Sequence, residues 1–267
     1  MNLAQANQHQ QDTWASGDFP KMGVQLAIAG ELLCEAVPVH AGDRLLDVGT
    51  ASGNTALAAA RRRARVTGID LVPSLLDRAR QRASAEGLEI DFQEGDAMAL
   101  AFPNASFDVV TSTFGAIFAP DPDRTAAEMA RVCRPGGKLA MAVWTPDGML
   151  GRLFLLLARY APPELALAAP VEWGEEGIYR KRLGPYGEVA VKLQNVGFRA
   201  ISPDGWVEFM KTYFGPAIQA FGGATPAAQN ALAVEMRALI QEFNRAENGT
   251  VLAPSYYLEI VVTRPGK

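Results

Sequence analysis

Two periodicities of apolar residues alternate along the middle of the chain. Strands are predicted at residues 44–48, 65–69, 89–93, 107–111 and 138–144, most of them short segments rich in apolar residues. Apolar residues at helical spacing predict helices over 55–63, 73–86 and 123–133, and Pro73 and Gly87 mark the two ends of the second. This alternation over residues 44–144 predicts a mainly parallel, doubly wound α/β sheet.

The flanking segments follow different patterns. Residues 1–20 are mostly polar, with a single tryptophan at Trp14, and predict a short helix and a loop, and helical spacing continues over 23–37 up to Pro38. Residues 145–185 contain five prolines and an apolar helix at 150–160, which indicates an insertion over the ligand edge of the sheet. Beyond it we expect helices at 189–198, 206–221 and 226–245, a short strand at 198–201, and a closing strand at 256–263.

These patterns divide the chain into four parts. An N-terminal helical segment (1–40) is expected to cover the pocket of an α/β core (41–144). A helical, acceptor-binding region with one short strand follows (145–250), and residues 251–267 return to the sheet as its closing strand. With 267 residues and 49% apolar content, the chain is long enough to bury a sizeable core.

Charge narrows the class of partner. The net charge is −4 and the pI is about 5.4, so no general affinity for nucleic acid is expected. The one basic run, at 61–65, ends a predicted helix, where cations complement the helix dipole. Cys34 and Cys133 lack metal-like spacing, so no metal is expected, and both indicate buried thiols in a reducing compartment. Without a signal peptide or a membrane-length apolar segment, we expect a cytoplasmic protein with no stable membrane insertion.

The strand at 44–48 and the turn after it carry the most specific signal. An apolar run leads into Asp47, then into a glycine-punctuated turn, then into an Ala-rich helix, and a second strand ends on Asp70. This is the layout of a nucleotide-binding βαβ unit, in which small residues let the backbone approach the ligand. A carboxylate at Asp47 would repel a pyrophosphate but suits a ligand with an ammonium group, such as S-adenosylmethionine.

Further acids and polar groups end the neighbouring strands, where an open α/β sheet binds its ligands. Asp70 can accept hydrogen bonds from a ribose diol, and Asp96, beside Ala97, can accept from an adenine amino group. The fourth strand runs into Thr113 and Phe114, at the edge where a carbonyl can hold a methionine amine. Three acids at adjacent strand ends, each matched to one part of the same ligand, indicate more than helix capping.

The motifs LLDVGTASG, VTGID, EGDAMALAF, FDVVTSTFGAIFAPD and RVCRPGGKLAMAVW carry a family resemblance. Across residues 44–144 the sequence resembles the class I S-adenosylmethionine-dependent methyltransferases, in the group with small-molecule and quinone methyltransferases. The resemblance implies a Rossmann-like, seven-stranded, mostly parallel sheet whose last strand is antiparallel, with a helical lid. It further implies a cofactor site composed of Asp47, Gly49, Thr50, Ala51, Gly53, Asp70, Leu71, Asp96, Ala97, Thr113 and Phe114. Leu71 would flank the adenine ring.

One position departs from the family pattern. Ala51 stands where a glycine is usual, and its methyl group is accommodated if φ is negative there. An NAD(P)-dependent oxidoreductase on the same fold is a second interpretation, but it requires glycines where Ala51 and Asn54 stand. A third is a non-catalytic scaffold that binds S-adenosylmethionine, although such a protein has no need of all three acids.

The acceptor is expected to be a small, apolar or aromatic molecule methylated on oxygen, nitrogen or carbon. The aromatic candidates for its pocket are Trp14, Phe19, Phe114, Phe118, Trp144, Trp173, Tyr179, Trp206, Tyr213 and Phe214, with Trp14, Phe118, Trp173 and Tyr213 selected as substrate-binding residues. The fourth strand lacks the Asn/Asp-Pro-Pro-aromatic motif of nucleic-acid amino-methyltransferases. His40 falls at the wrong sheet edge and His9 precedes the core, so no catalytic residue is assigned. Monomer and homodimer both remain open.

Overall fold

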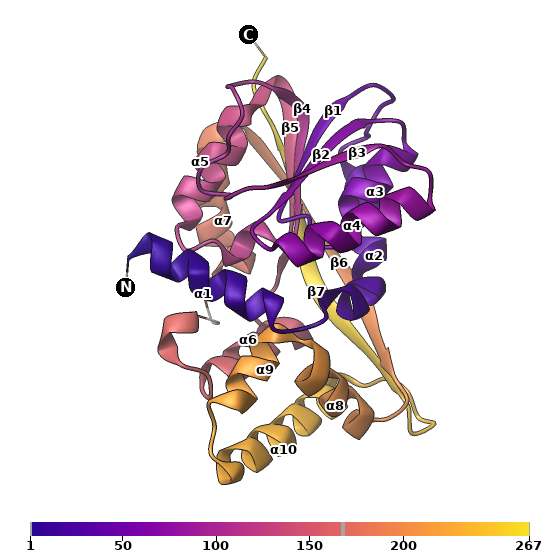
Figure 1. Cartoon of the computed structure of the whole chain (residues 1–267), viewed down its shortest axis with the longest axis vertical. Helices are drawn as coiled ribbons and strands as arrows, with labels where there is room; N and C mark the ends of the chain where they lie inside the picture. Colours follow the sequence, from indigo (N-terminus) through magenta and orange to yellow (C-terminus); the bar gives the residue numbers. More distant parts are fainter. Residues whose placement is uncertain (1, 167–168, 267) are drawn as a thin grey trace.

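A single sheet of seven strands organises the molecule, and the computed structural model describes residues 2–166 and 169–266 (Figure 1). The strands are β1 (Arg44–Val48), β2 (Arg65–Asp70), β3 (Ile90–Glu94), β4 (Phe107–Thr113), β5 (Cys133–Trp144), β6 (Glu188–Ala200) and β7 (Val251–Thr263). Their order is β3-β2-β1-β4-β5-β7-β6, with β1 to β5 parallel and β7 antiparallel to both neighbours. The predicted fold class is therefore confirmed. The strand order reverses between β1 and β4, which places the topological switch there.

Helices cover both faces of this sheet. They are α1 (Leu3–Ala15), α2 (Phe19–Ala36), α3 (Asn54–Arg61), α4 (Pro73–Ala85), α5 (Pro122–Val132), α6 (Met149–Ala158), α7 (Glu176–Leu183), α8 (Pro203–Tyr213), α9 (Gly215–Gly222) and α10 (Pro226–Phe243). Short 3-10 turns are η1 (Ala116–Phe118), η2 (Pro163–Leu165), η3 (Ala169–Gly174) and η4 (Gly184–Tyr186). Helices α2, α3 and α4 lie on one side of the sheet and α5 and α7 on the other (Figure 1). None of the helices in the described ranges is long and apolar enough to cross a bilayer.

A two-stranded ribbon extends beyond the edge of the main sheet. Strand β5 ends at Trp144, opposite Tyr257, whereas β7 begins at Val251 and pairs with β6 as far as Ala200. Figure 1 shows this ribbon running towards a group of helices formed by α6, α8, α9 and α10, with α1 crossing between that group and the sheet. Helices α6, α8, α9 and α10 are thus connected to the core by β6 and β7.

The helix predicted at 189–198 is wrong, because that segment belongs to β6. Every residue from Glu188 to Ala200 pairs with a residue of β7, so the short strand expected at 198–201 is the end of a much longer one. Val189, Val191 and Leu193 alternate with polar or small residues at a period of two, which is the strand signal. The region 145–250 therefore contains a complete edge strand of the core sheet besides its helices.

Smaller differences also arise in the C-terminal half. The single helix expected at 206–221 is two helices, α8 and α9, which meet at Gly215. A Cβ at Gly215 would lie 2.1 Å from the carbonyl oxygen of Thr13, so the close approach of α1 requires glycine there. Helix α7 lies within 145–185 and was not anticipated. The other predicted helices and strands of residues 44–144 are confirmed, with shifts at their ends.

Candidate functional site

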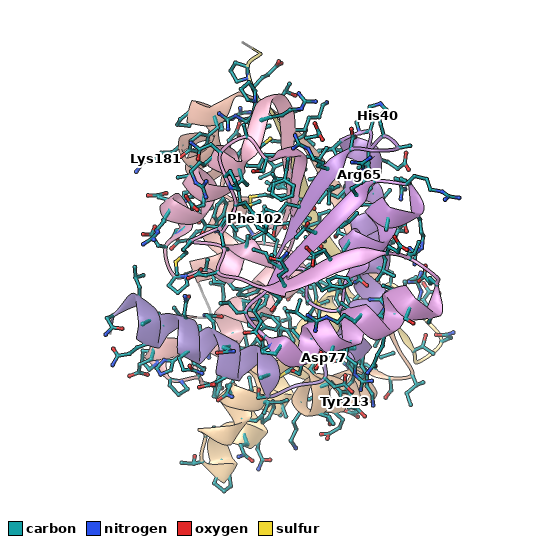
Figure 2. The ribbon with its side chains drawn as sticks, turned by 45° about the horizontal axis from the view of Figure 1, so that its top comes forward. His40, Arg65, Asp77, Phe102, Lys181 and Tyr213 are labelled. Atoms are coloured by element: carbon teal, nitrogen blue, oxygen red, sulfur yellow. The ribbon has the colours of Figure 1, made fainter. Side chains whose placement is uncertain are left out.

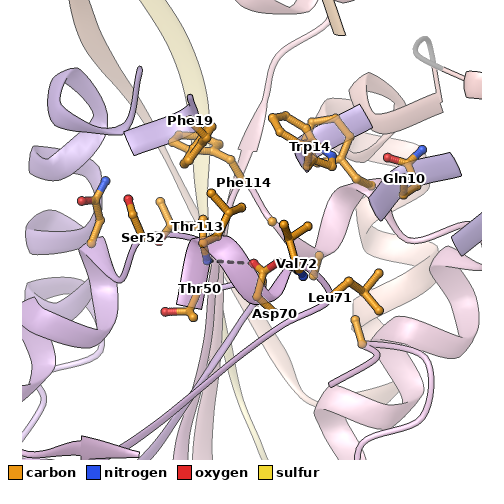
Figure 3. Close-up of a pocket in the computed structure, with 18 of the residues that line it drawn as sticks. Gln10, Trp14, Phe19, Thr50, Ser52, Asp70, Leu71, Val72, Thr113 and Phe114 are labelled. Carbon is orange, nitrogen blue, oxygen red and sulfur yellow. Dashed lines mark hydrogen bonds between the residues drawn. The ribbon is translucent and has the colours of Figure 1, made fainter. Parts of the chain in front are cut away.

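A cavity opens where the carboxyl ends of β1, β2 and β4 meet (Figure 3). Ten of the residues expected at a cofactor site line it, namely Asp47, Gly49, Thr50, Ala51, Asp70, Leu71, Asp96, Ala97, Thr113 and Phe114. Gly53 does not: it precedes α3 with φ +86°, and a Cβ there would point at Leu57, Ala79 and Phe92. The strand ends thus bring together side chains that lie up to 67 residues apart, from Asp47 to Phe114.

Asp47 is the most deeply buried acid of the cavity, with 1% of its surface exposed. The hydroxyl groups of Thr50 and Thr111 donate hydrogen bonds to its two oxygens, at 2.7 and 2.9 Å. Burial raises the pKa of Asp47 to about 6, despite these hydrogen bonds, and the nearby charge of Asp70 acts in the same direction. A buried carboxylate in this position would be stabilised by a cation.

Asp70 ends β2 and accepts two backbone hydrogen bonds. The amide of Ala51 donates to Oδ2 at 2.8 Å, the contact drawn as a dashed line in Figure 3, and the amide of Val72 donates to Oδ1 at 3.0 Å. Burial raises the pKa of Asp70 to about 6 as well. Each oxygen keeps a further lone pair, so the carboxylate can accept two more hydrogen bonds from a diol.

Asp96 connects the sheet to α1. Its Oδ1 accepts from the amide of Met98 at 2.8 Å, and its Oδ2 accepts from Nδ2 of Asn7 at 2.7 Å. One turn further along α1, Nε2 of Gln11 donates to the carbonyl oxygen of Leu71 at 2.8 Å. Two side-chain amides of α1 therefore hold this helix against the ends of β2 and β3.

Sequence reasoning missed these amide-bearing side chains of α1. Asn7, Gln10, Gln11 and Trp14 follow the spacing i, i+3, i+4 and i+7, so they share one face of the helix. That spacing was a signal, but a polar stripe in a polar segment is usually a solvent-exposed face. Here Gln10, Gln11 and Trp14 line the cavity.

The loops after β1 and β4 hold two residues in the left-handed region. Ala51 has φ +47°, so the negative φ under which its methyl group would be accommodated is not observed. Phe114 has φ +61°, and its buried ring stacks on Trp144 at 3.7 Å. Such backbone costs about 1–2 kcal/mol per non-glycine residue. The hydrogen bond from the Ala51 amide to Asp70 helps to hold the first of these conformations.

A glycine pair explains why these loops can meet. A Cβ on Gly115 would lie 2.4 Å from the carbonyl oxygen of Gly49, and a Cβ on Gly49 would lie 2.8 Å from Cα of Gly115. The two backbones therefore cross in contact at the topological switch of the sheet. Gly115 was not singled out from the sequence, although it belongs to the quoted motif at 107–121.

Aromatic rings form the opposite side of the cavity. Trp14 of α1 lies 4.7 Å from Phe118 of η1 and 5.9 Å from Phe214, between centroids. The full aromatic lining is Trp14, Phe19, Phe114, Phe118, Trp144, Phe154 and Phe214. Of the four residues selected for substrate binding, Trp14 and Phe118 thus line the cavity.

Trp173 and Tyr213, the other two selected residues, lie elsewhere. Trp173 is buried with the Arg182 guanidinium 4.9 Å from its ring centroid. The ring of Tyr213 is covered by the Lys21 ammonium at 4.1 Å and does not line the cavity; Figure 2 shows its position. Tyr179 and Trp206 are likewise buried away from it.

Among the described residues, the three aspartates are the only titratable side chains that line the cavity. Figure 2 shows His40 near Arg65, at the amino end of β2, and its side chain is 77% exposed. His9 lies on α1 but does not line the cavity. Burial raises the thiol pKa of Cys34 to about 12 and that of Cys133 to about 11, so neither is a nucleophile near neutral pH.

Comparisons with known proteins agree with this architecture. A family model described as "Methyltransferase domain" matches residues 46–141. The uncharacterized protein Rv1403c of Mycobacterium tuberculosis is 39% identical over 249 residues, covering 90% of this chain and 89% of its own. The demethylmenaquinone methyltransferase of Deinococcus radiodurans is 40% identical over 147 residues, covering 54% of this chain and 59% of its own. The crystal structure of YcgJ from Bacillus subtilis, 22% identical, superimposes with a TM-score of 0.60 over 89% of this chain and 98% of its own.

Proposed function

The chain belongs to the class I S-adenosylmethionine-dependent methyltransferases, and on that premise we propose that it methylates a small apolar or aromatic acceptor in the cavity beside β1 and β4. The proposal has two parts. The first assigns S-adenosylmethionine to the strand-end side of the cavity, formed around Asp47, Asp70 and Asp96. The second assigns the methyl acceptor to the aromatic side, formed around Trp14, Phe118 and Phe214.

The single observation that supports the first part is the set of three acids at the ends of β1, β2 and β3. Asp47 is buried and Asp70 is half-buried, both have raised pKa values, and neither has a cationic partner within the described residues. Buried carboxylates of this kind favour a ligand that brings positive charge and hydrogen-bond donors. A dinucleotide would bring a pyrophosphate instead, which argues against the oxidoreductase interpretation.

Each acid matches one part of the cofactor. Asp47 would face the methionine ammonium, and Asp70 would accept hydrogen bonds from the ribose hydroxyls. Asp96 and the backbone at Ala97 would bind the adenine edge, and Leu71 would pack against the ring. Thr113 and Phe114 would lie near the methionine end, since they stand at the carboxyl end of β4, the strand that pairs with β1 as far as Asp47. Gly53 would act indirectly, by letting the loop turn into α3.

Methyl transfer requires little chemical participation by the side chains of the protein. S-adenosylmethionine, when bound, supplies a methyl group on a sulfonium that needs no further activation. In such a transfer the acceptor atom would bond the methyl carbon while the carbon–sulfur bond breaks and its electron pair stays on sulfur. The protein aligns the two partners and excludes water from them. Trp14, Phe118 and Phe214 would do the second task, because they close the cavity on the acceptor side.

The lining also limits how a proton leaves the acceptor. Apart from the three aspartates assigned to the cofactor, no titratable side chain lines the cavity in the described ranges. An acceptor that loses a proton must therefore release it to water or enter already ionised. This favours acceptors with acidic hydroxyl groups or with carbon nucleophiles stabilised by conjugation.

The test is methyl transfer from labelled S-adenosylmethionine to a panel of phenols, hydroquinones and amines, with RNA and bulk protein as comparison substrates. Because the D. radiodurans relative is named for demethylmenaquinone, quinone-derived ring systems belong in the panel. We expect labelled product with one of the small aromatic classes only. Transfer to RNA or protein at a comparable rate would contradict the acceptor class while leaving the cofactor assignment intact.

A further inference from the structure

We propose that Gln10 is the polar anchor of the acceptor, so that the acceptor is an apolar ring system carrying a hydroxyl or N–H donor. The inference rests on the proposed function of the same cavity and names the feature by which it selects its second substrate. In this arrangement Oε1 of Gln10 accepts a hydrogen bond from the donor.

The orientation of the Gln10 amide is fixed by its partner. Nε2 lies 3.3 Å from the carbonyl oxygen of Leu165, in η2. A carbonyl only accepts hydrogen bonds, so the nitrogen must face Leu165 and the oxygen must point away from it. Of the described atoms, none donates to Oε1 of Gln10, although that oxygen is buried.

A buried hydrogen-bond acceptor without a donor is unfavourable, and native proteins rarely leave one. Because Gln10 lines the cavity, a ligand in the cavity can supply the donor. Figure 3 shows Gln10 beside Trp14, on the side of the cavity formed by α1.

The neighbours of Gln10 separate it from the cofactor assignment. The adjacent Gln11 faces Leu71, and Asn7 faces Asp96, so those two residues lie at the strand-end side. Gln10 instead faces η2, and Trp14, one turn further, packs on Phe118 and Phe214. Gln10 therefore belongs to the aromatic side, where the acceptor would bind.

This combination defines a chemical class. The rings around Trp14 and Phe118 favour a flat apolar molecule. The single buried oxygen, Oε1 of Gln10, favours one hydrogen-bond donor on that molecule. A carboxamide cannot take a proton at neutral pH, so Gln10 would orient the acceptor and would not act as a base. A molecule of the same shape without a donor would leave Oε1 unpaired, which predicts roughly tenfold weaker binding.

The experiment compares 2-naphthol with 2-methylnaphthalene, which replaces the hydroxyl by a methyl group of similar size. Binding of each probe to the full chain is measured by calorimetry, with and without S-adenosylhomocysteine. We expect wild-type protein to prefer 2-naphthol by about tenfold. Gln10→Met, which keeps side-chain length but removes the acceptor oxygen, should reduce the preference to about twofold or less.

Gln8→Met is the matched control, since Gln8 lies on the exposed side of the same helix and bonds Asp12. It should keep the preference. An unchanged affinity for S-adenosylhomocysteine verifies that each variant is folded, and Gln10→Ala provides a second, smaller replacement that should lose the preference as well.

Three outcomes would overturn the proposal. They are an equal affinity of wild-type protein for the two probes, an unchanged preference in both Gln10 variants, and no binding of either probe to wild-type protein. A failure of S-adenosylhomocysteine to bind wild-type protein contradicts the proposed cofactor instead. The probe titrations without it still test Gln10 in that case.

Discussion

The two sides of the cavity are built by different means. The acids of the strand-end side all come from residues 47–96, and backbone amides and hydroxyl groups fix Asp47 and Asp70. From outside this segment, Asn7 and Gln11 of α1 add side-chain hydrogen bonds to Asp96 and to the Leu71 carbonyl. The aromatic side gathers residues of α1, η1 and α6 with Phe214, which lies between α8 and α9, and it is held by ring packing. Trp14 and Phe214 are 200 residues apart in the sequence. The first side is a local feature of the chain, and the second exists only after the chain has folded.

This difference separates the tasks of the two sides. Carboxylates on the strand-end side would set the charge and orientation of a ligand, and the buried one, Asp47, costs stability in the empty protein. Aromatic packing on the other side stabilises the fold and sets the shape of a second ligand without fixing its chemistry. Changes on the strand-end side should therefore alter cofactor binding and leave acceptor binding intact. Changes on the aromatic side should alter acceptor binding and leave cofactor binding intact.

The largest effect is expected for Asp47→Asn. The substitution removes the charge that would pair with the methionine ammonium, so the affinity for S-adenosylhomocysteine should fall about a hundredfold or more. The empty protein should keep or gain thermal stability, because an amide can still bond the hydroxyl groups of Thr50 and Thr111 without the cost of a buried charge. Calorimetry and thermal unfolding measure the two effects. Asp91→Asn, on the exposed face of β3, is the control and should change neither.

The pH dependence should run in opposite directions for binding and for stability. Asp47 and Asp70 must be ionised to bind the cofactor, so the affinity for S-adenosylhomocysteine should weaken by up to about tenfold per acid for each pH unit below 6. Calorimetric titrations with S-adenosylhomocysteine between pH 5 and pH 8 measure this effect, because that range includes the pKa of about 6 of both acids. An affinity for S-adenosylhomocysteine that stays the same across that range would contradict a role for either carboxylate.

The stability contribution has the other sign. Each of the two acids binds its proton at about pH 6 in the folded protein but near 3.8 when unfolded. Between these values the folded state holds more protons, so this contribution falls as the pH rises and stays low above 6. The gain in melting temperature of Asp47→Asn over wild type should therefore be greatest above pH 6 and vanish near pH 4. A gain that is equal at both ends would contradict the buried charge.

A smaller and complementary effect is expected for Phe118→Leu on the aromatic side. The ring packs on Trp14 and Phe154, and its loss should raise the KM for an aromatic acceptor several-fold. The affinity for S-adenosylhomocysteine should change less than about twofold, since the strand-end contacts are untouched. Steady-state kinetics and calorimetry separate the two. A larger loss of cofactor affinity than of acceptor affinity would break the division between the two sides.

The smallest effect is expected for Ala51→Gly. Glycine adopts the φ of +47° without the cost that alanine carries, so the variant should be more stable by about 1 kcal/mol. For a chain of this size, that gain corresponds to an increase in melting temperature of roughly 2–4 °C. A decrease would indicate that the methyl group of Ala51 makes contacts that outweigh its backbone strain.

The accuracy of sequence prediction followed the same division. Strands β1 and β5 were identified because parallel strands covered by helices on both faces read as apolar runs. The edge strand β3, with the sequence IDFQE, was identified from its place between two predicted elements instead. The three acids were identified because the topology places the ends of those strands at one edge. Both signals are local, and each needs only a few residues.

The rest depended on tertiary context. Strand β6 is an edge strand whose residues Val189, Val191 and Leu193 are only partly covered. The apolar residues of this segment are also compatible with one face of a short helix. The choice was settled by pairing with β7, more than 50 residues away. The role proposed for Gln10 could not be predicted for a similar reason, because the carbonyl of Leu165 that orients it comes from a distant segment. Trp173 and Tyr213 were selected by residue type alone, and packing placed both away from the cavity.

The most direct test of the central claim is a calorimetric titration of wild-type protein and Asp70→Ala with S-adenosylhomocysteine, with NAD and NADP as parallel ligands. The strand-end acids predict binding with a Kd on the order of micromolar for S-adenosylhomocysteine alone, and a loss greater than about tenfold in Asp70→Ala. Binding of a dinucleotide, or an affinity for S-adenosylhomocysteine that survives the loss of Asp70, would contradict the account.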